Sequence, residues 1–197
     1  MGVSRKKAEQ NHRKILDAAE QLFRQKGVEG VGLNELMKKA GFTQGGFYNH
    51  FASKDALVSE VLQQAMGKGW EHLTQDLEEG REQGEDPVRH EVEFYLSPEH
   101  RNDVKCGCPM AGFIAEVPRL SKADQKAYAA GLDKTFQKLA DELMAQHPGL
   151  DPLEARARGV ALYSQMVGSL LLSRAVAATA PELSGEILED GRSQVKV

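Results

Sequence analysis

Residues 40–57, AGFTQGGFYNHFASKDAL, place two glycines directly before an aromatic cluster. A glycine inside a helix costs about 1 kcal/mol relative to alanine, so Gly45 and Gly46 are unexpected where the surrounding pattern predicts a short helix. Phe47 and Phe51 are four residues apart and share one face of that helix. The segment therefore predicts an aromatic face packed inside the protein. It also predicts an adjoining polar face, left for a partner, that is formed by Gln44, Gly45, Tyr48 and Asn49.

The residues just before this segment complete a recognisable pattern. Residues 33–51 are two short helices joined by AGFT, and a tight glycine-containing turn between two short helices is the form of a helix-turn-helix unit. A helix whose first turn enters a DNA groove benefits from the absence of Cβ atoms, because its backbone then approaches phosphates and base edges closely. Binding to DNA would therefore account for the glycine pair.

The polar side chains of the segment suit such contacts. Hydroxyl and ammonium groups bind phosphates, whereas amide side chains pair with base edges. The sequence therefore predicts phosphate contacts from Tyr48, Lys54, His50 and the N-cap Thr43, and base contacts from Gln44 and Asn49. The alternative interpretation is that TQGGF is a loop and that Tyr48 is a half-buried aromatic residue.

The rest of the chain has residues typical of helix starts and helix ends, and it has no strand pattern of convincing length. Gly27 and Gly41 are expected to end helices, and serine, aspartate and proline mark several helix starts. The pattern predicts an all-α fold of roughly nine helices. They are expected over residues 13–27, 33–41, 43–51, from 53 toward 80, 86–96, a short one within 97–109, and then over 121–146, 151–179 and from 181 onward. Residues 110–120 are apolar and form a short segment.

Composition places the chain among ordinary globular proteins. It has 197 residues, of which 41% are hydrophobic and 27% charged. No signal peptide is expected, and the longest apolar stretch, VGSLLLSRAVAA, is too short and too interrupted to span a bilayer. Two cysteines do not make a disulfide framework, so a cytoplasmic location and no membrane partner are expected.

The charges are unevenly distributed along the chain. Residues 1–55 carry ten Lys and Arg against six Asp and Glu, whereas the remainder carries 15 against 23. A basic N-terminal part on an acidic body suits a protein that presents one end to a polyanion.

Residues 13–57 resemble the N-terminal domain of the TetR (tetracycline-repressor) family of bacterial transcription regulators. The resemblance lies in the first helix ILDAAEQLFRQKG, the helix-turn-helix LMKKAGFTQGGFYNHF and the helix start SKDAL. It implies a helix-turn-helix DNA-binding domain over residues 1–56 with a three-helix fold. It further implies a helical effector-binding and dimerisation domain over 57–197, and a homodimer on double-stranded operator DNA.

The resemblance also assigns individual positions. Gln44, Gly45, Gly46, Tyr48, Asn49, His50 and Lys54 fall on DNA-contact positions of the family. The chain departs from the family where Val31 and Gly32 stand in place of a Thr or Ser that caps the second helix. Neither residue has a hydroxyl group for a phosphate contact, and Asn34 is the expected substitute.

In the C-terminal part, the resemblance implies an architecture and leaves the chemistry open. The helix with Val160, Tyr163, Val167, Leu170 and Leu171, with small Ala161, Ser164 and Gly168 between, is expected to form a dimer seam; the alternative is an internal core helix. An unknown small-molecule effector, apolar or aromatic, is expected in a pocket. Its predicted lining is Trp70, Phe94, Cys108, Met110, Phe113, Tyr128 and Met166, although an aromatic residue at helical spacing is more often plain core.

The segment KCGCPMAGF leaves three interpretations of its cysteines open. Cys108 is a small buried residue, or a reactive thiol at a helix N-terminus with Lys105 nearby. In the third interpretation Cys106, Cys108 and His100 bind a metal, although a Cys-x-Cys pair supplies only two ligands. No cofactor or metal is expected.

Together with the resemblance, these patterns predict a transcriptional regulator, namely a repressor that a small-molecule effector releases from its operator. The alternative within this class is a repressor that senses oxidants or electrophiles through Cys108. An enzyme would need a nucleophile–base pair or a metal constellation, and none is suggested by the spacing of the six histidines. A helical protein-interaction bundle is the third option.

Overall fold

The computed structural model describes residues 5–195, which form nine α-helices and two short 3-10 helices. The all-α prediction is confirmed. The chain forms two compact units: Met1–Gly67 with Val104–Gln125, and Lys68–Asp103 with Lys126–Val197. The functional division expected between residues 56 and 57 stays a prediction. Among residues 5–195, no helix is both long enough and apolar enough to cross a membrane.

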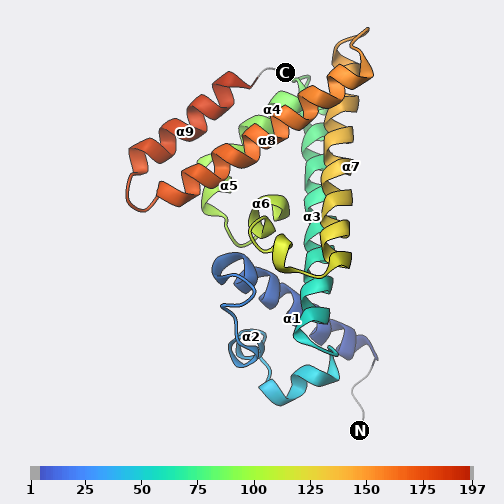
Figure 1. The fold of residues 1–197 in the computed structure, drawn as a ribbon, viewed down its shortest axis with the longest axis vertical. Coiled ribbons are helices and arrows are strands. Elements are labelled where there is room, and N and C mark those ends of the chain that lie inside the picture. Colours follow the sequence, from blue (N-terminus) through green and yellow to red (C-terminus); the bar gives the residue numbers. More distant parts are fainter. Residues whose placement is uncertain (1–4, 196–197) are drawn as a thin grey trace. The chain divides into compact units, whose positions relative to one another are not determined.

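The first unit contains the segment quoted at the start. Its elements are α1 (Arg5–Lys26), α2 (Leu33–Lys39), the 3-10 helix η1 (Gln44–Asn49), the beginning of α3 (Lys54–Glu82), α6 (Pro109–Phe113) and the 3-10 helix η2 (Val117–Arg119) (Figure 1). Fully buried side chains come from α1, α2, η1, α3 and α6. They include Ile15, Phe23, Leu36, Phe47 and Leu57. The helix-turn-helix therefore packs on α1 and α3 around one apolar core.

The expected third helix of this unit is a 3-10 helix rather than an α-helix. The amide of Gly46 donates to the carbonyl of Thr43 at 3.0 Å, and the amide of His50 donates to the carbonyl of Phe47 at 2.9 Å, both with i→i+3 spacing. Two adjacent glycines weaken an α-helix, and a short 3-10 turn tolerates them. Thr43 lies at the N-cap with extended backbone, but its side chain makes no capping hydrogen bond.

Other helix boundaries follow local signals. Gly27 and Gly41 have positive φ angles of 74° and 85° at the ends of α1 and α2, as predicted. The Ser53 hydroxyl accepts from the amide of Ala56 at 3.0 Å at the start of α3. The helix then continues through Gly67 to Glu82 without a break. The largest difference is at the start of α1, which begins at Arg5 and not at residue 13. Helix α8 ends at Val176 and not at residue 179.

The second unit contains α4 (Pro87–Tyr95), α5 (Pro98–Asn102), most of α7 (Lys122–Gln146), α8 (Pro152–Val176), α9 (Pro181–Gln194) and the end of α3 (Figure 1). Asp86 and Asp151 cap α4 and α8 with their carboxylates, each followed by proline at the first helical position, as predicted. Helices α8 and α9 pack closely. A Cβ added at Gly191 of α9 would lie 2.8 Å from Ser169 Oγ of α8, so this close contact favours glycine.

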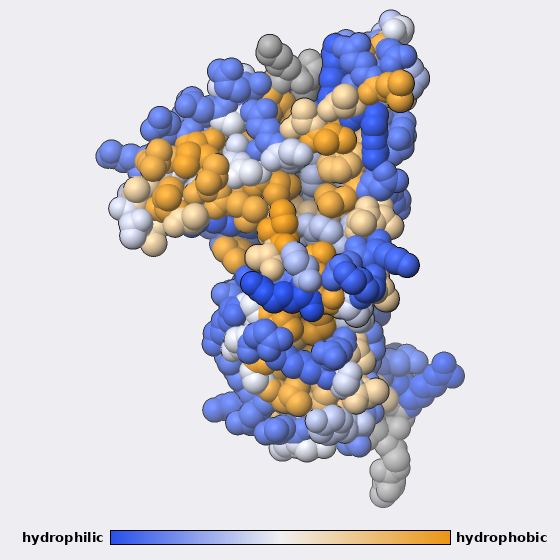
Figure 2. All heavy atoms as spheres, in the orientation of Figure 1, coloured by the Kyte–Doolittle hydropathy of each residue, from blue (hydrophilic) through white to orange (hydrophobic). Residues whose placement is uncertain are grey.

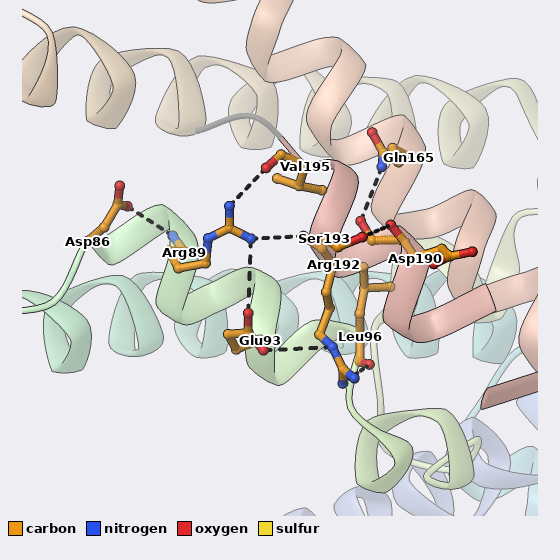
Figure 3. A network of polar contacts seen from close by, with 10 residues as sticks. Asp86, Arg89, Glu93, Leu96, Gln165, Asp190, Arg192, Ser193 and Val195 are labelled. Carbon is orange, nitrogen blue, oxygen red and sulfur yellow. Dashed lines mark hydrogen bonds and ion pairs between the residues drawn. The ribbon is translucent and has the colours of Figure 1, made fainter. Parts of the chain in front are cut away.

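The C-terminal end of α9 is tied to α4 by arginines (Figure 3). Arg89 of α4 donates to the carbonyl oxygens of Arg192 at 2.8 Å and Val195 at 2.9 Å. In return, Arg192 donates to the carbonyl oxygen of Leu96 at 3.0 Å and lies 3.7 Å from the Glu93 carboxylate. Helix α4 is therefore linked by several bonds to the last turn of α9.

Candidate nucleic-acid interface and ligand groove

The 3-10 helix η1 separates a buried aromatic side from an exposed polar side. Phe47 is fully buried and stacks on Phe51 with ring centroids 5.5 Å apart. Tyr48 packs edge-on against Phe47 at 5.2 Å but is 69% exposed. Thr43, Gln44, Gly45 and Asn49 are exposed as well. The structure thus places most of the predicted DNA-contact residues together on one exposed surface.

The two glycines of η1 are not explained by packing within the chain. A Cβ built at Gly45 would meet no other atom within 4 Å among the described residues. A Cβ at Gly46 would lie 3.8 Å from Met37 Cε, which is an ordinary contact. Their φ angles are not in the left-handed region either, since the positive-φ glycines of the described chain lie elsewhere. Neither packing nor a left-handed backbone within the described residues accounts for these two glycines.

Lys54 and His50 have structural neighbours as well as their predicted DNA role. Lys54 Nζ donates to the carbonyl oxygen of Val28 at 2.7 Å and so joins the start of α3 to the loop after α1. An ammonium group has three donors, so this bond does not exclude a phosphate contact. His50 is half-buried, and its ring lies 6.2 Å from that of Phe42.

The start of helix α2 lacks a side-chain cap, as the sequence indicated. Gly32 is its N-cap and makes no side-chain capping bond, while Asn34 is exposed in the first turn. Lys38 and Lys39, in the last turn of α2, are exposed close in sequence to η1. These two lysines were absent from the residue-level prediction, although they contribute to the positive charge counted over residues 1–55.

A segment from much later in the chain, Val104–Gln125, belongs to the same unit. Arg24 of α1 pairs with Glu20 at 2.9 Å and also donates to the carbonyl oxygen of Gly107. The Glu116 carboxylate accepts from the amide of Val28 at 3.3 Å. The Arg24 and Glu20 side chains are only 2% and 6% exposed. The helix-turn-helix is therefore fastened to the segment that carries both cysteines.

The two cysteines differ in exposure. Cys106 is exposed and Cys108 is half-buried at the N-cap of α6, and both are reduced. Helix α6 has only five residues, so the predicted activating effect of a helix terminus is small. No group of three or more His, Cys, Asp or Glu side chains within residues 5–195 is arranged to hold a metal ion.

The predicted effector-pocket residues are distributed over both units. Cys108, Met110 and Phe113 belong to the first unit, and the other four to the second. Tyr128 and Met166 are buried, and Trp70 lies under the ammonium of Lys134, which is 3.5 Å from the ring centroid. Neither unit alone contains all seven, so the predicted pocket stays a prediction.

Phe94 does line a concave surface. A groove of about 540 Å³ lies between α3 and α4 within the second unit, and its lining residues are Lys68, Glu71, His72, Gln75, Asp76, Glu79, His90 and Phe94. Sequence reasoning did not find this groove, although His72 and Asp76 have the i, i+4 spacing that brings two side chains together on a helix.

One side of α8 forms an apolar surface together with α9. Tyr163, Val167 and Leu170 are buried within the chain, so these three predicted seam residues are part of the core. Val160 and Leu172 of α8 are 36% and 62% exposed. Leu183 of α9 is 45% exposed, and apolar side chains gather over these two helices in Figure 2.

Comparison with known proteins agrees with this architecture. Residues 15–61 match the family described as bacterial regulatory proteins, tetR family. The chain is 31% identical over 129 residues to the HTH-type transcriptional repressor NemR of Escherichia coli, covering 66% of this chain and 65% of that protein. It is 26% identical over 159 residues to an HTH-type transcriptional regulator from the lacX 3′ region of Lactococcus lactis, covering 81% of each.

Solved structures extend the similarity over nearly the whole chain. The reduced form of E. coli NemR has a TM-score of 0.76 at 26% identity, covering 95% of this chain and 96% of that one. A TetR transcriptional regulator from Chloroflexus aurantiacus has a TM-score of 0.79 at 20% identity, covering 96% and 94%. At 20% identity, the second structure shows similarity of fold alone.

Proposed function

This chain belongs to the TetR family of bacterial regulatory proteins, and we propose that it is a repressor released from its operator by a small molecule. It is a DNA-binding transcriptional regulator with a helix-turn-helix, and η1 is the element that enters the major groove in this proposal. The observation that carries the proposal is the exposed polar side of η1, where no other atom of residues 5–195 would lie within 4 Å of a Cβ at Gly45.

The roles of single residues follow from their chemistry. Tyr48 and Lys54 bind phosphates and set the position of η1 on the duplex, whereas Gln44 and Asn49 read base edges. The exposed Lys38 and Lys39 add to the positive field at this end of the unit. Phosphate contacts of this kind release counterions, so operator affinity falls steeply with salt.

The operator-binding form in this proposal is a homodimer. Two copies joined along the exposed side of α8 and α9 would present two η1 elements to successive major grooves, about 34–36 Å apart for adjacent half-sites. The exposed Val160, Leu172 and Leu183 support this seam, because large apolar side chains are costly to leave in water.

Operator binding tests the first part of the proposal. Fluorescence anisotropy with labelled DNA from upstream of the chain's own gene is measured at stepped salt concentrations. Tyr48→Ala should weaken binding to all sequences and reduce the salt slope by about one. Gln44→Ala should instead relax the preference at one base position, by about 1–3 kcal/mol. Lys126→Ala, an exposed lysine on α7, is the control and should change neither quantity.

The proposal fails if Tyr48→Ala binds the operator like the unmodified protein. It also fails if no fragment binds more tightly than an unrelated duplex of equal length. In that case a helical protein-interaction module would be the better description of the chain.

A second candidate function is control of operator binding by a thiol. It is supported by the position of Gly107 between the two cysteines, with its carbonyl oxygen bound to Arg24 of the helix-turn-helix unit. The relative NemR has been solved in a form named as reduced. In this candidate function, a modification at Cys108 shifts the Gly107 carbonyl and loosens its bond to Arg24.

Alkylation separates this candidate from the main proposal. N-ethylmaleimide forms a bond between Sγ and a carbon of its double bond, and the thiol proton passes to the neighbouring carbon. Modification of Cys108 in a Cys106→Ser background should lower operator affinity, whereas the Cys108→Ser protein should be insensitive. Complete modification of Cys108 with unchanged operator affinity would remove the thiol candidate and leave the small-molecule mechanism in place.

A further inference from the structure

The groove between α3 and α4 has the dimensions of a small-molecule site. Its volume of about 540 Å³ lies within the range of about 300–1,000 Å³ typical of such sites. The walls are close because α4 approaches α3 at Gly80, where an added Cβ would lie 2.7 Å from His90 Cβ and 3.1 Å from Pro87 Cα. The backbone contact at Gly80 therefore holds His90 and Phe94 opposite the side chains of α3.

The floor of the groove holds a buried carboxylate. Asp76 is only 7% exposed, and the one polar contact of its Oδ2 atom among the described residues is with His72. Oδ2 lies 3.0 Å from Nδ1 of His72, a contact that is an ion pair only while the imidazole is protonated. A buried carboxylate without a full set of partners is costly, so a positive charge in the groove would be stabilised there.

The other charged side chains that line the groove also favour a positively charged ligand. Glu71 and Glu79 add two carboxylates to the lining, against the single ammonium of Lys68. His90 already pairs with Glu85, at 2.9 Å. With neutral histidines the lining is negative.

Phe94 supplies an aromatic wall next to this carboxylate. Its ring is 36% exposed, and its centroid lies 4.7 Å from that of His72 and 5.3 Å from that of His100. The face of an aromatic ring attracts cations, and the attraction grows when the cation is partly desolvated. A buried carboxylate beside an exposed aromatic ring suits a ligand that carries both a positive charge and an apolar part. It suits a metal ion or an anion less well.

We propose that this groove binds an organic cation, with its ammonium group beside Asp76 and its apolar part against Phe94. The inference names the chemical class of the effector, and in that respect it rests on the proposed function. Binding in the groove itself involves no DNA and can be measured without it.

The cation and protonated His72 compete for the Asp76 carboxylate. The pKa of His72 is raised above its ordinary value, chiefly by the Asp76 carboxylate and against the opposing effect of burial. The groups around the imidazole are Lys68, Glu71, Asp76 and Glu79 on α3, His90 on α4 and His100 on α5. Because protonated His72 repels the cation and occupies Asp76, affinity should rise with pH through the pKa of His72, by at most about tenfold per pH unit.

The position of the groove links it to the dimer seam. Helix α4 carries His90 and Phe94 on its groove side, while its Arg89 holds the end of α9 through the carbonyl oxygens of Arg192 and Val195 (Figure 3). A ligand that displaces α4 therefore acts on α9 through bonds within the same unit. This gives the groove a physical route to a helix of the proposed seam.

Titration calorimetry with phenyltrimethylammonium and the full-length protein tests the site. The uncharged compound of the same shape, tert-butylbenzene, serves as the matched ligand. We expect saturable binding of one cation per chain, and affinity at least about tenfold weaker, or about 1.4 kcal/mol, for the uncharged compound. Asp76→Asn and Phe94→Leu should each weaken the cation severalfold. Glu186→Gln, which neutralises an exposed carboxylate on α9, should not.

A second measurement remains informative if Asp76→Asn does not fold. His72→Gln should bind the cation with an affinity that no longer rises between pH 6 and pH 8. Equal affinity for the charged and uncharged compounds, or an unchanged pH dependence in His72→Gln, would overturn the inference. Failure to bind operator DNA would instead overturn the proposed function, since the titration contains no DNA.

Discussion

Arg24, in the last turn of α1, donates a hydrogen bond to the carbonyl oxygen of Gly107, which lies 83 residues later in the chain. Its second guanidinium nitrogen pairs with Glu20 at 2.9 Å, and both side chains are almost completely buried. A Cβ on Gly112 would lie 3.3 Å from Arg24 Nη1, so the α6 segment also fits closely around this arginine. One side chain thus joins the DNA-binding helices to the segment that carries the cysteines.

Removal of this arginine should destabilise the first unit strongly. Arg24→Met keeps the apolar length of the side chain but removes the ion-pair partner of Glu20, which retains the hydrogen bond from the Gln64 amide at 3.1 Å. Breaking a buried ion pair from one side costs about 3–5 kcal/mol. The double variant Arg24→Met with Glu20→Leu removes both charges and should recover much of the loss. Urea unfolding followed by circular dichroism measures both. A single variant that loses less than about 1 kcal/mol would show that the buried pair contributes little.

Gly45 should show opposite effects on stability and on DNA binding. Gly45→Ala adds a methyl group where no other described atom lies within 4 Å, so the free energy of unfolding should stay constant or rise by up to about 1 kcal/mol. Operator affinity should fall, because the methyl group would stand between the η1 backbone and DNA.

Gly67→Ala is the matched control for Gly45→Ala. Gly67 lies within α3, is exposed, and has equally open space around it. The control should raise stability by a similar amount and leave operator affinity unchanged. If Gly45→Ala also leaves operator affinity unchanged, the prediction that the η1 backbone closely approaches DNA is wrong.

Local signals in the sequence predicted most helix boundaries correctly. Asp86 and Asp151 cap their helices as expected, and Ser121 Oγ accepts from the amide of Asp124 at 3.1 Å at the start of α7. These features depend on residues within one turn of each other. The 3-10 geometry of η1 was missed, because a short segment with two glycines differs little in sequence between the two helix types.

Long-range features could not be predicted in the same way. The bond from Arg24 to Gly107 joins residues 83 positions apart, and no periodicity indicates which carbonyl a buried arginine will reach. The groove likewise depends on the approach of α4 to Gly80. Of the predicted pocket residues, Phe94 lines the groove, whereas Tyr128 and Met166 are buried. Aromatic and sulfur side chains at helical spacing do not by themselves distinguish a pocket from a core.

A charge on the exposed side of α8 should separate the proposed dimer. Leu172 is 62% exposed within the chain, so Leu172→Asp should leave the monomer folded while it places an unpaired charge in the seam. Sedimentation velocity should then report a monomer with unchanged helix content. Ala129→Asp, on the exposed side of α7, is the control and should remain a dimer. A fully dimeric Leu172→Asp protein would place the seam elsewhere.

His100 should make the second unit sensitive to acid. Burial lowers the pKa of His100 from 6.5 to about 4, although its ring bonds the carbonyl oxygen of Tyr95 through Nδ1 at 2.7 Å. The folded state therefore binds its proton less readily than the unfolded state does. The contribution to stability is complete above pH 6.5 and is lost as the pH falls from 6.5 toward 4. Between pH 7 and pH 4.5 this single group should lower the free energy of unfolding by about 2 kcal/mol.

Comparison with a variant isolates this contribution from that of the carboxylates, which also titrate at low pH. His100→Gln keeps a polar side chain at the position but cannot take up a proton in this range. Its stability at pH 7 should be lower, since the stacking on Phe94 is lost, yet its decline from pH 7 to pH 4.5 should be shallower by about 2 kcal/mol. Urea unfolding at both pH values gives the two slopes. Parallel slopes would mean that His100 takes up its proton equally well in the folded protein, and that its burial is relieved by a local opening of α5.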